Sequence, residues 1–161
     1  MSVWWLAINA REGHCFYRDL KKRAVIAQGW PDIGDVDYVR RMPRSHVEDE
    51  LRRKLNEAHG EVQESLPARL FALFCRIEPG DLVVGIEGTL VAGICKMPAD
   101  INHHYDPAWN YAHGLGPVEW VDWEEFSPDW TPVAPAKSVL AVAQMRQSAP
   151  HVERIARAYW P

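Results

Sequence analysis

Hydrophobic and polar positions along the first third of the chain predict two short strands separated by a polar segment. Apolar, β-prone residues at 3–9 predict the first strand, and residues 24–28 predict the second. Residues 11–23 between them are polar and contain a glycine, which predicts a loop. A turn is expected at residues 32–35, because Asp and Gly supply tight backbone geometry.

Two helices follow, each marked by apolar residues at helical spacing. Residues 45–48 (Ser-His-Val-Glu) match the capping box S-x-x-E at a helix start. Apolar residues recur every three or four positions from Val47 onward, and Gly60 can end this helix. Residues 66–77 predict a second helix with one apolar side.

The pattern then changes back to strands. Residues 81–87 and 90–97 predict a β-hairpin that turns through Gly88 and Thr89. Residues 98–116 are expected to form a long loop crowded with histidine and aromatic side chains. Residues 117–123 alternate in polarity and predict another strand.

The last part of the chain completes an α+β pattern. Residues 138–145 fit a strand or a helix equally well, and a final helix is expected to begin at Ser148. The element order lacks the strict βαβ alternation of a parallel nucleotide-binding sheet. Glycine-rich phosphate loops and internal repeats are also absent from the sequence. We therefore predict a single α+β domain over residues 1–161, built on a mixed or curled sheet.

Composition narrows the class of protein. The 161 residues are 47% hydrophobic and 25% charged, as in ordinary globular domains. The sequence has no apolar run long enough to span a membrane, and its first residues do not resemble a signal peptide. Three cysteines without a C-x-x-C pair do not suggest a disulfide framework, so we expect a cytoplasmic location and no membrane partner.

Eight tryptophans are an unusually large number for this length, and one of them lies in a distinctive loop. Trp30 stands between Gly29 and Pro31, where it can offer its ring face for stacking. Asp32 and Asp35 could accept hydrogen bonds from the amino groups of a base. The alternative is that Trp30 folds back and covers the end of the sheet.

A second aromatic group lies in the loop 103–113. Tyr105, Trp109 and Tyr111, with Trp120 and Trp123 from the following strand, could form an aromatic wall of the kind that holds unpaired or flipped bases. The same residues could instead pack the long loop onto the domain. His103, His104, Asp106 and His113 are potential metal ligands, but their spacing matches no closed zinc pattern. We predict no metal, no other cofactor and no catalytic residues.

Charge is distributed unevenly along the chain. The formal net charge is −4, yet residues 1–60 carry 11 Lys and Arg against 9 Asp and Glu. Residues 99–133 contain seven acidic residues and no Lys or Arg. The basic residues could hold a phosphate backbone if they share a face, or they could be ordinary solvated patches. The candidate phosphate-binding residues are Arg18, Lys21, Lys22, Arg40, Arg41 and Arg44.

Several short segments resemble EVE-type domains of the PUA-like superfamily, which also includes the YTH and ASCH domains. Residues 24–35 are similar to a family segment that contains Gly-Trp and, further on, Gly-Asp. Residues 79–84, 91–94 and 117–120 follow in the family's order, on either side of the loop with Tyr105 and Tyr111. The resemblance covers about residues 3–125 and is greatest to domains of modification-dependent restriction systems.

The resemblance implies a PUA-like curled mixed β-barrel with flanking helices. It also implies nucleic-acid binding, most often DNA, with a flipped methylated or hydroxymethylated base seated in an aromatic pocket. Trp30 and Asp32 match the family's loop Trp and its neighbouring acid, while Tyr105, Trp109 and Tyr111 match the aromatic loop only by position. A separately encoded nuclease or other effector is a possible partner. The alternatives are a protein-interaction module with an aromatic surface, and an ASCH-like ribonuclease.

Overall fold

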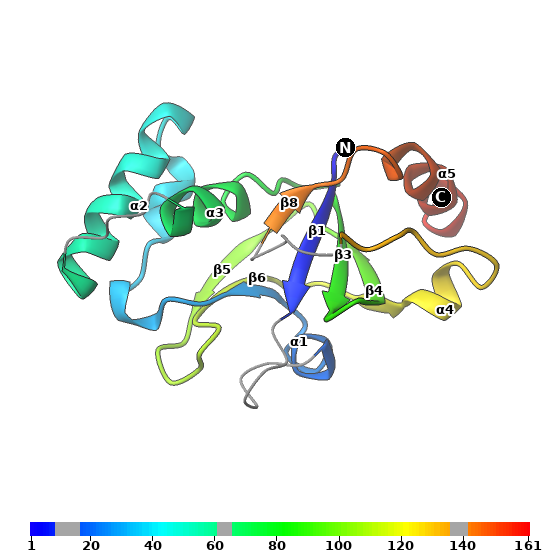
Figure 1. Ribbon diagram of the computed structural model, residues 1–161, viewed down its shortest axis with the longest axis horizontal. Coiled ribbons are helices and arrows are strands. Elements are labelled where there is room, and N and C mark those ends of the chain that lie inside the picture. Colours follow the sequence, from blue (N-terminus) through cyan, green and yellow to red (C-terminus); the bar gives the residue numbers. More distant parts are fainter. Residues whose placement is uncertain (9–16, 61–65, 136–141) are drawn as a thin grey trace.

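The computed structural model describes residues 1–8, 17–60, 66–135 and 142–161. Within these ranges the chain is an α+β fold with a five-stranded sheet, a three-stranded sheet and helices around them, as predicted. Figure 1 shows helices at both ends of the molecule and the strands between them. The described strands do not close into a barrel. Every helix in the described ranges is too short or too polar to span a bilayer.

The large sheet has the strand order β7-β4-β3-β1-β8. Its centre is the parallel pair β1 (Val3–Ile8) and β3 (Leu82–Glu87), and β3 forms the predicted hairpin with β4 (Leu90–Lys96). The edge strands are β7 (Trp120–Asp122) and β8 (Val142–Gln144). The first strand and the hairpin are thus confirmed. In the segment 138–145, which fitted a strand or a helix, residues 142–144 form strand β8, and residues 138–141 lie outside the described residues.

The small sheet is antiparallel and has the order β2-β6-β5, with β2 at Ile26–Gln28, β6 at His113–Gly116 and β5 at Asn102–Tyr105. The prediction of one long loop over residues 98–116 is therefore wrong. β6 is followed within four residues by β7, so one stretch of chain passes from the small sheet to the large one. The backbone N–H of Val118 donates to Ala24 O (2.8 Å) at this passage.

Two helices pack together at one end of the molecule, on the left in Figure 1. The first is α2 (Arg44–His59), and the second is α3 (Leu66–Phe74), which ends three residues earlier than predicted. The predicted capping box is wrong, because the residue before α2 is Pro43 and no side chain caps the helix. Gly60 follows α2 with φ 77°, a left-handed value that glycine adopts without strain.

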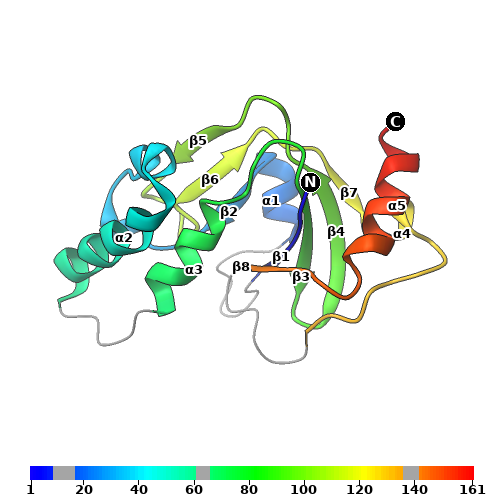
Figure 2. The same cartoon turned by 90° about the horizontal axis from the view of Figure 1, so that it is seen from above.

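The other helices are shorter or lie at the opposite end. Helix α1 (Tyr17–Arg23) replaces the described part of the predicted loop 11–23, and residues 11–16 lie outside the described residues. Helix α4 (Trp123–Phe126) follows β7, so the predicted strand 117–123 is shortened at both ends. Helix α5 (Ala149–Tyr159) begins after Ser148 as predicted. Figure 2 shows α4 and α5 beside the large sheet, away from α2 and α3.

Two short 3-10 helices, η2 (Pro31–Ile33) and η3 (Asp37–Arg41), connect β2 to α2. The core has two parts because alternate side chains of β1 face opposite sides of the large sheet. Trp4 and Leu6 belong to the cluster that reaches α2 and α3, while Val3 and Trp5 belong to the cluster under α4 and α5. Half of the eight tryptophans are therefore explained by core packing, since Trp4, Trp5, Trp120 and Trp123 are all buried.

Helix α1 is held against the large sheet by Tyr17. Its ring packs edge-on against Trp120 (5.5 Å between centroids), and its hydroxyl donates to Asp122 Oδ1 (2.9 Å). This position is open only because β4 has a glycine there. A Cβ added to Gly93 would lie 2.1 Å from Tyr17 Oη and 2.6 Å from Val121 O.

We expect Gly93→Ala to lower the free energy of unfolding by about 2 kcal/mol, because neither α1 nor the neighbouring strand can move away without losing its contacts. Urea denaturation measures this change. Lys96→Ala is the matched control: its side chain is exposed on the same strand, so the expected change is under about 0.5 kcal/mol. Equal effects of the two substitutions would contradict the close approach of Tyr17 to β4.

Candidate functional site

A pocket of about 450 Å³ lies on one face of the small sheet. Alternate residues along β5 share this face, so Asn102, His104 and the next residue in the series, Asp106, all line the pocket. Gly114 of β6 is paired with His104 and also lines it. Because glycine has no side chain, the sheet surface beside His104 is left open.

The hairpin loop between β5 and β6 supplies an aromatic wall. Trp109 and Tyr111 both line the pocket, with 5.9 Å between their ring centroids. The loop is closed by a hydrogen bond from Asp106 N to Ala112 O (2.8 Å). Asp106 also accepts from the backbone of the loop, with Trp109 N bonded to its carbonyl oxygen and Ala108 N to its Oδ1. Asp106 therefore fixes the loop that carries both rings.

Arg23, at the end of α1, brings a positive charge to the same pocket. Its guanidinium carbon lies 4.0 Å from the centroid of the Trp109 ring, and its Nη1 pairs with Asp106 Oδ2 at 3.0 Å. A guanidinium over an indole is attracted to the ring face and is held in a defined plane. The pocket thus combines two aromatic rings, one guanidinium and a row of three polar side chains.

Three of the six predicted phosphate-binding residues, Arg18, Lys21 and Lys22, belong to the same helix as Arg23. Lys21 Nζ pairs with Asp122 Oδ1 (2.8 Å). This contact and the hydrogen bond from the Tyr17 hydroxyl both lower the pKa of Asp122. Lys22 is exposed. Helix α1 is therefore the basic element that contacts the pocket, through its last residue, Arg23.

Trp30 does not line this pocket. It adopts a left-handed backbone conformation (φ 61°, ψ 59°) and stacks on Phe71 of α3, with 5.3 Å between ring centroids. Its carbonyl oxygen lies 3.0 Å from His113 Nε2. His113 and Tyr105 occupy the face of the small sheet opposite to His104, so Trp30 lies on the α3 side of that sheet.

The structure therefore divides the predicted aromatic residues between two faces of one sheet. Tyr105 stays with Trp30, since its hydroxyl donates to Pro31 O (2.5 Å), while Trp109 and Tyr111 form the pocket wall. Trp120 is only 4% exposed and donates its indole N–H to Val25 O (2.8 Å). Its prediction as a base-binding residue is corrected, because its ring lies in the core.

The two acidic candidates of the Trp30 loop, Asp32 and Asp35, are exposed at the surface of the protein. Asp32 Oδ2 is 3.7 Å from His59 Nε2, and Asp35 Oδ1 is 3.3 Å from His103 Nδ1. Neither of them lines the pocket that holds Trp109. Trp30 and Asp32 therefore do not form one site with this pocket.

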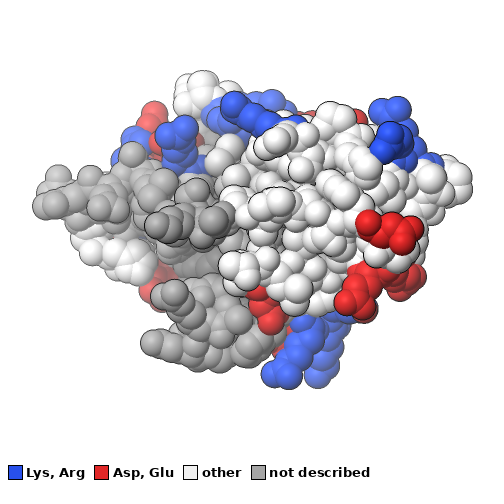
Figure 3. All heavy atoms as spheres, turned by 45° about the vertical axis from the view of Figure 1, so that its right-hand side comes forward, with Lys and Arg blue, Asp and Glu red and all other residues white. Residues whose placement is uncertain are grey.

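The remaining basic candidates, Arg40, Arg41 and Arg44, lie on η3 and at the start of α2, at the left end of Figure 1. They do not line the pocket beside α1. The six candidate phosphate-binding residues therefore form two separate groups. Figure 3 shows charged side chains in small groups around a broad uncharged area, with no continuous basic stripe among the residues described on that face.

The four residues considered as potential metal ligands lie on both sides of the small sheet. His103 and His104 face opposite sides of β5, and His113 lies on the side of His103. In the described ranges, no three side chains of the kinds that bind metals gather around one point. Burial raises the pKa of the Cys75 thiol to about 12 and that of Cys95 well above its usual value, so both are poor nucleophiles at neutral pH. Cys15 lies outside the described residues.

Sequence reasoning missed Arg23, Asn102 and His104 as lining residues of the pocket. The signal for the last two was present, because Asn102, His104 and Asp106 alternate as on one face of a strand. Arg23 could be found only as the end of a basic run, since its approach to Trp109 depends on the tertiary fold.

No model of a known protein family matches the chain, and a search of curated proteins finds no match either. The resemblance to EVE-type domains stays a prediction from the sequence.

Proposed function

We propose that the protein binds nucleic acid and seats an unpaired base in the pocket between β5, β6 and the end of α1. The observation that carries this proposal is the meeting of an aromatic wall, a guanidinium and a polar row in one pocket of about 450 Å³. A volume of this size suits a planar ring system. Aromatic faces stack on bases, and polar side chains at the edge can hydrogen-bond to the base.

The resemblance adds finer detail to this proposal. Under it, the fold is a PUA-like curled barrel with flanking helices, and the bound base is a flipped, modified one in DNA. A base methyl group adds apolar area, which Trp109 and Tyr111 would cover. The proposal places the base at these two residues rather than at Trp30 and Asp32, because only the former line the pocket. A cytoplasmic location and a separate effector protein stay predictions.

Helix α1 is the proposed contact to the phosphate backbone. Arg18, Lys21 and Lys22 share the helix that brings Arg23 to the pocket, so a strand whose base enters there would pass close to them. Each phosphate neutralised on duplex DNA contributes a slope of about −0.9 in log affinity against log salt. Since one seven-residue helix makes few contacts, we expect a shallow salt dependence.

We expect Trp109→Ala to weaken binding of a single-stranded oligonucleotide with one methylated cytosine by roughly 5–150-fold, because base–aromatic stacking contributes about 1–3 kcal/mol per base. Tryptophan quenching or fluorescence anisotropy measures the affinity, and circular dichroism checks the fold. Trp160→Ala is the matched control: this Trp is half-buried next to Phe126, far in the fold from β5. It should bind as the parent does.

Trp30→Ala distinguishes the pocket from the site that the resemblance implies. Loss of binding with Trp30→Ala, in a folded variant, together with parental binding by Trp109→Ala, would move the base to the Trp30 loop. Parental affinity in both variants would reject base stacking altogether and favour a protein-interaction module. The two substitutions therefore distinguish a base in the pocket, a base at the Trp30 loop and a protein-interaction module.

One observation keeps a ribonuclease as a second candidate. The aromatic loop itself has no Lys or Arg, but Arg23 reaches the pocket from α1 and joins His104, Asp106 and Tyr111 there. An imidazole for proton transfer and a guanidinium for a phosphate are groups that RNA cleavage uses. Cleavage of a fluorescent RNA that is abolished by His104→Ala would establish this activity. Binding of DNA without any cleavage of RNA would favour the binding module.

A further inference from the structure

We propose that a second, smaller pocket, between η3, α2 and the end of α3, binds a phosphate group. It has a volume of about 110 Å³ and lies among residues that the base pocket does not use. Its charged lining residues are Arg40, Arg44, Arg76 and Glu78, and its walls are otherwise mostly apolar. This site goes beyond the proposed base binding, since it takes a single small anion.

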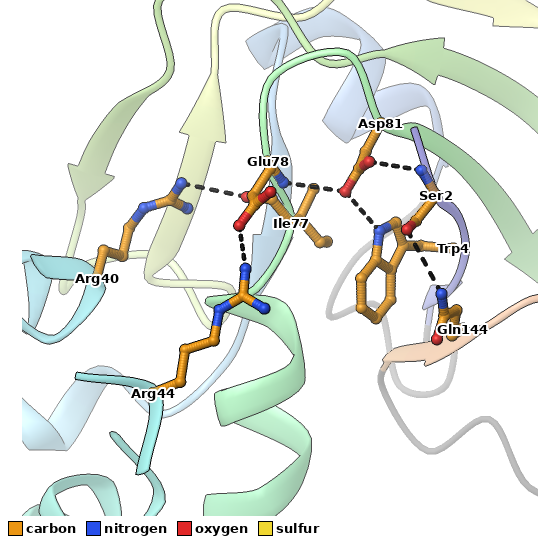
Figure 4. Close-up of polar contacts among 8 residues, drawn as sticks. All are labelled: Ser2, Trp4, Arg40, Arg44, Ile77, Glu78, Asp81 and Gln144. Carbon is orange, nitrogen blue, oxygen red and sulfur yellow. Dashed lines mark hydrogen bonds and ion pairs between the residues drawn. The ribbon is translucent and has the colours of Figure 1, made fainter. Parts of the chain in front are cut away.

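The lining of this pocket carries an excess of positive charge. Three arginines and one glutamate line it, although the whole chain has a net charge of −4. Arg44 is paired with Glu78, and Figure 4 shows the side chains of Arg40 and Arg44 extended toward residues 77 and 78. The Arg44 and Glu78 side chains are exposed, so water screens that pair, whereas Arg40 is half-buried and is screened less. An anion would balance the excess.

Arg40 is the residue whose interactions are incomplete. Its Nη2 donates to Ile77 O at 3.3 Å, while its Nη1 is buried and has no hydrogen-bond partner in the described part of the chain. A buried donor without an acceptor costs free energy, and for a charged donor the cost is larger. Arg40 lines the pocket, so an anion bound there would offset its charge, and a small rotation of the guanidinium would let a phosphate oxygen reach Nη1.

The neighbouring groups do not neutralise Arg40. Burial lowers its pKa, against the opposing effects of Cys75, Asp37 and Glu78. Burial also raises the pKa of the Cys75 thiol to about 12, so this thiol is neutral at pH 7. Asp37 pairs with Arg41 at 3.1 Å, and Glu78 pairs with Arg44. Arg40 is therefore a half-buried cation without an ion pair of its own among the described residues.

The size of the pocket selects the form of the phosphate. About 110 Å³ accommodates one tetrahedral group. A phosphodiester within a strand has a sugar on each side, whereas a terminal phosphate can enter end-on. The ligand is therefore inorganic phosphate or the terminal phosphate of a nucleic acid, and these two sources share the same chemistry.

The first experiment is a titration with inorganic phosphate, with sodium chloride at equal ionic strength as the reference. Thermal unfolding and the NMR chemical shifts of the Arg side chains are measured at each concentration. A ligand that binds only the folded state raises its stability and saturates. We expect a saturable rise with phosphate that chloride does not produce. An identical response to both salts would overturn the proposal.

Four single variants and one double variant test the assignment of residues. Arg44→Met should weaken phosphate binding about tenfold or more, since it removes a charged hydrogen bond. Glu78→Gln should strengthen it, because the competing carboxylate is lost. Arg41→Met is the matched control, because Arg41 is exposed and ion-paired as Arg44 is but does not line the pocket, so it should bind as the parent does. Arg40→Met should abolish binding, and parental binding by a folded Arg40→Met, Arg44→Met double variant would reject the site.

Two further comparisons identify the source and separate this site from the base pocket. An oligonucleotide with a 5′-phosphate that binds more tightly than the same strand without it, in an Arg40-dependent manner, identifies a terminal phosphate as the ligand. Equal binding of the two strands, with a response to inorganic phosphate, identifies the free anion. Trp109→Ala should keep the phosphate response, so failure of base binding leaves this result intact.

Discussion

Asp81→Ala is expected to lower the free energy of unfolding by about 3–4 kcal/mol. Asp81 is only 6% exposed, and its carboxylate accepts three hydrogen bonds. The donors are Ser2 N (2.7 Å), Trp4 Nε1 (2.8 Å) and Glu78 N (3.1 Å), as Figure 4 shows. Alanine would leave these donors without their acceptor, and each unsatisfied buried donor costs about 1–3 kcal/mol.

The same contacts explain why one residue has such a large effect. Asp81 joins the first strand of the chain to the turn that follows α3, so it connects segments 77 and 79 residues apart in sequence. Asp81→Asn is the informative companion, because the amide keeps one oxygen but places an NH₂ group against a donor. Its loss should be about half that of alanine. Urea denaturation at pH 7 measures both, and a loss below about 1 kcal/mol for alanine would show that water replaces the carboxylate.

Local sequence patterns predicted the elements that have an ordinary aliphatic side. The β3–β4 hairpin, the first strand and helices α2 and α5 were found because their apolar spacing and turn residues are local signals. Helix α1 was missed for a physical reason. It buries only Leu20, so its seven residues show no apolar repeat. Its position depends on the tertiary contacts of Tyr17 with Trp120 and Asp122.

Strand β2 of the small sheet was predicted, but β5 and β6 were missed because the face they turn toward α3 is made of rings rather than aliphatic side chains. His103 and Tyr105 of β5 stack with His113 of β6, at 5.6 Å and 5.2 Å between centroids. Polarity scales treat such residues as loop-forming, although here they are packed under α3. Aromatic enrichment near residues 103–113 was recognised, but the alternation that sends Tyr105 to one face and His104 to the other requires the strand pairing.

The candidate site was predictable in part. Trp109 and Tyr111 were named from the sequence and line one pocket, while Arg23 joins them only through the fold. Trp30 and Trp120 were named with them, but ring faces can be satisfied by the protein itself: Phe71 covers Trp30, and Trp120 donates its N–H to Val25. Composition alone cannot separate a tryptophan that stacks on its own core from one that is open to a ligand.

His113 gives the fold a sensitivity to acid that can be calculated from its surroundings. The ring is completely buried, and its Nε2 lies 3.0 Å from Trp30 O. Since a carbonyl only accepts, Nε2 carries the proton and Nδ1 is a bare acceptor, which has no partner in the described residues. Protonation would place an unpaired N–H⁺ in the core. Burial therefore lowers the pKa of His113 from 6.5 to about 4, with the nearby His103 acting in the same direction.

The sign of the effect follows from the two states. The unfolded chain takes up a proton at His113 near pH 6.5, but the folded chain does so only near pH 4. The stability that neutral His113 contributes is therefore complete above pH 6.5 and is lost progressively as the pH falls toward 4. Between pH 7 and pH 5 we expect a loss of about 2 kcal/mol from this residue.

Urea denaturation at pH 7, 6 and 5 tests this expectation in a range where most carboxylates stay ionised. His113→Phe removes the titrating ring but keeps an aromatic side chain against Phe71 and Tyr105, so its free energy of unfolding should change about 2 kcal/mol less than the parent's over this range. His46→Phe, an exposed position in α2, is the control and should keep the parental slope. His103→Phe is expected to reduce the slope to a smaller extent, because burial also lowers the pKa of His103 while Asp35 opposes it. A parental slope in His113→Phe would mean that water reaches Nδ1 in the folded protein, and that the ring stack between β5, β6 and α3 opens to solvent.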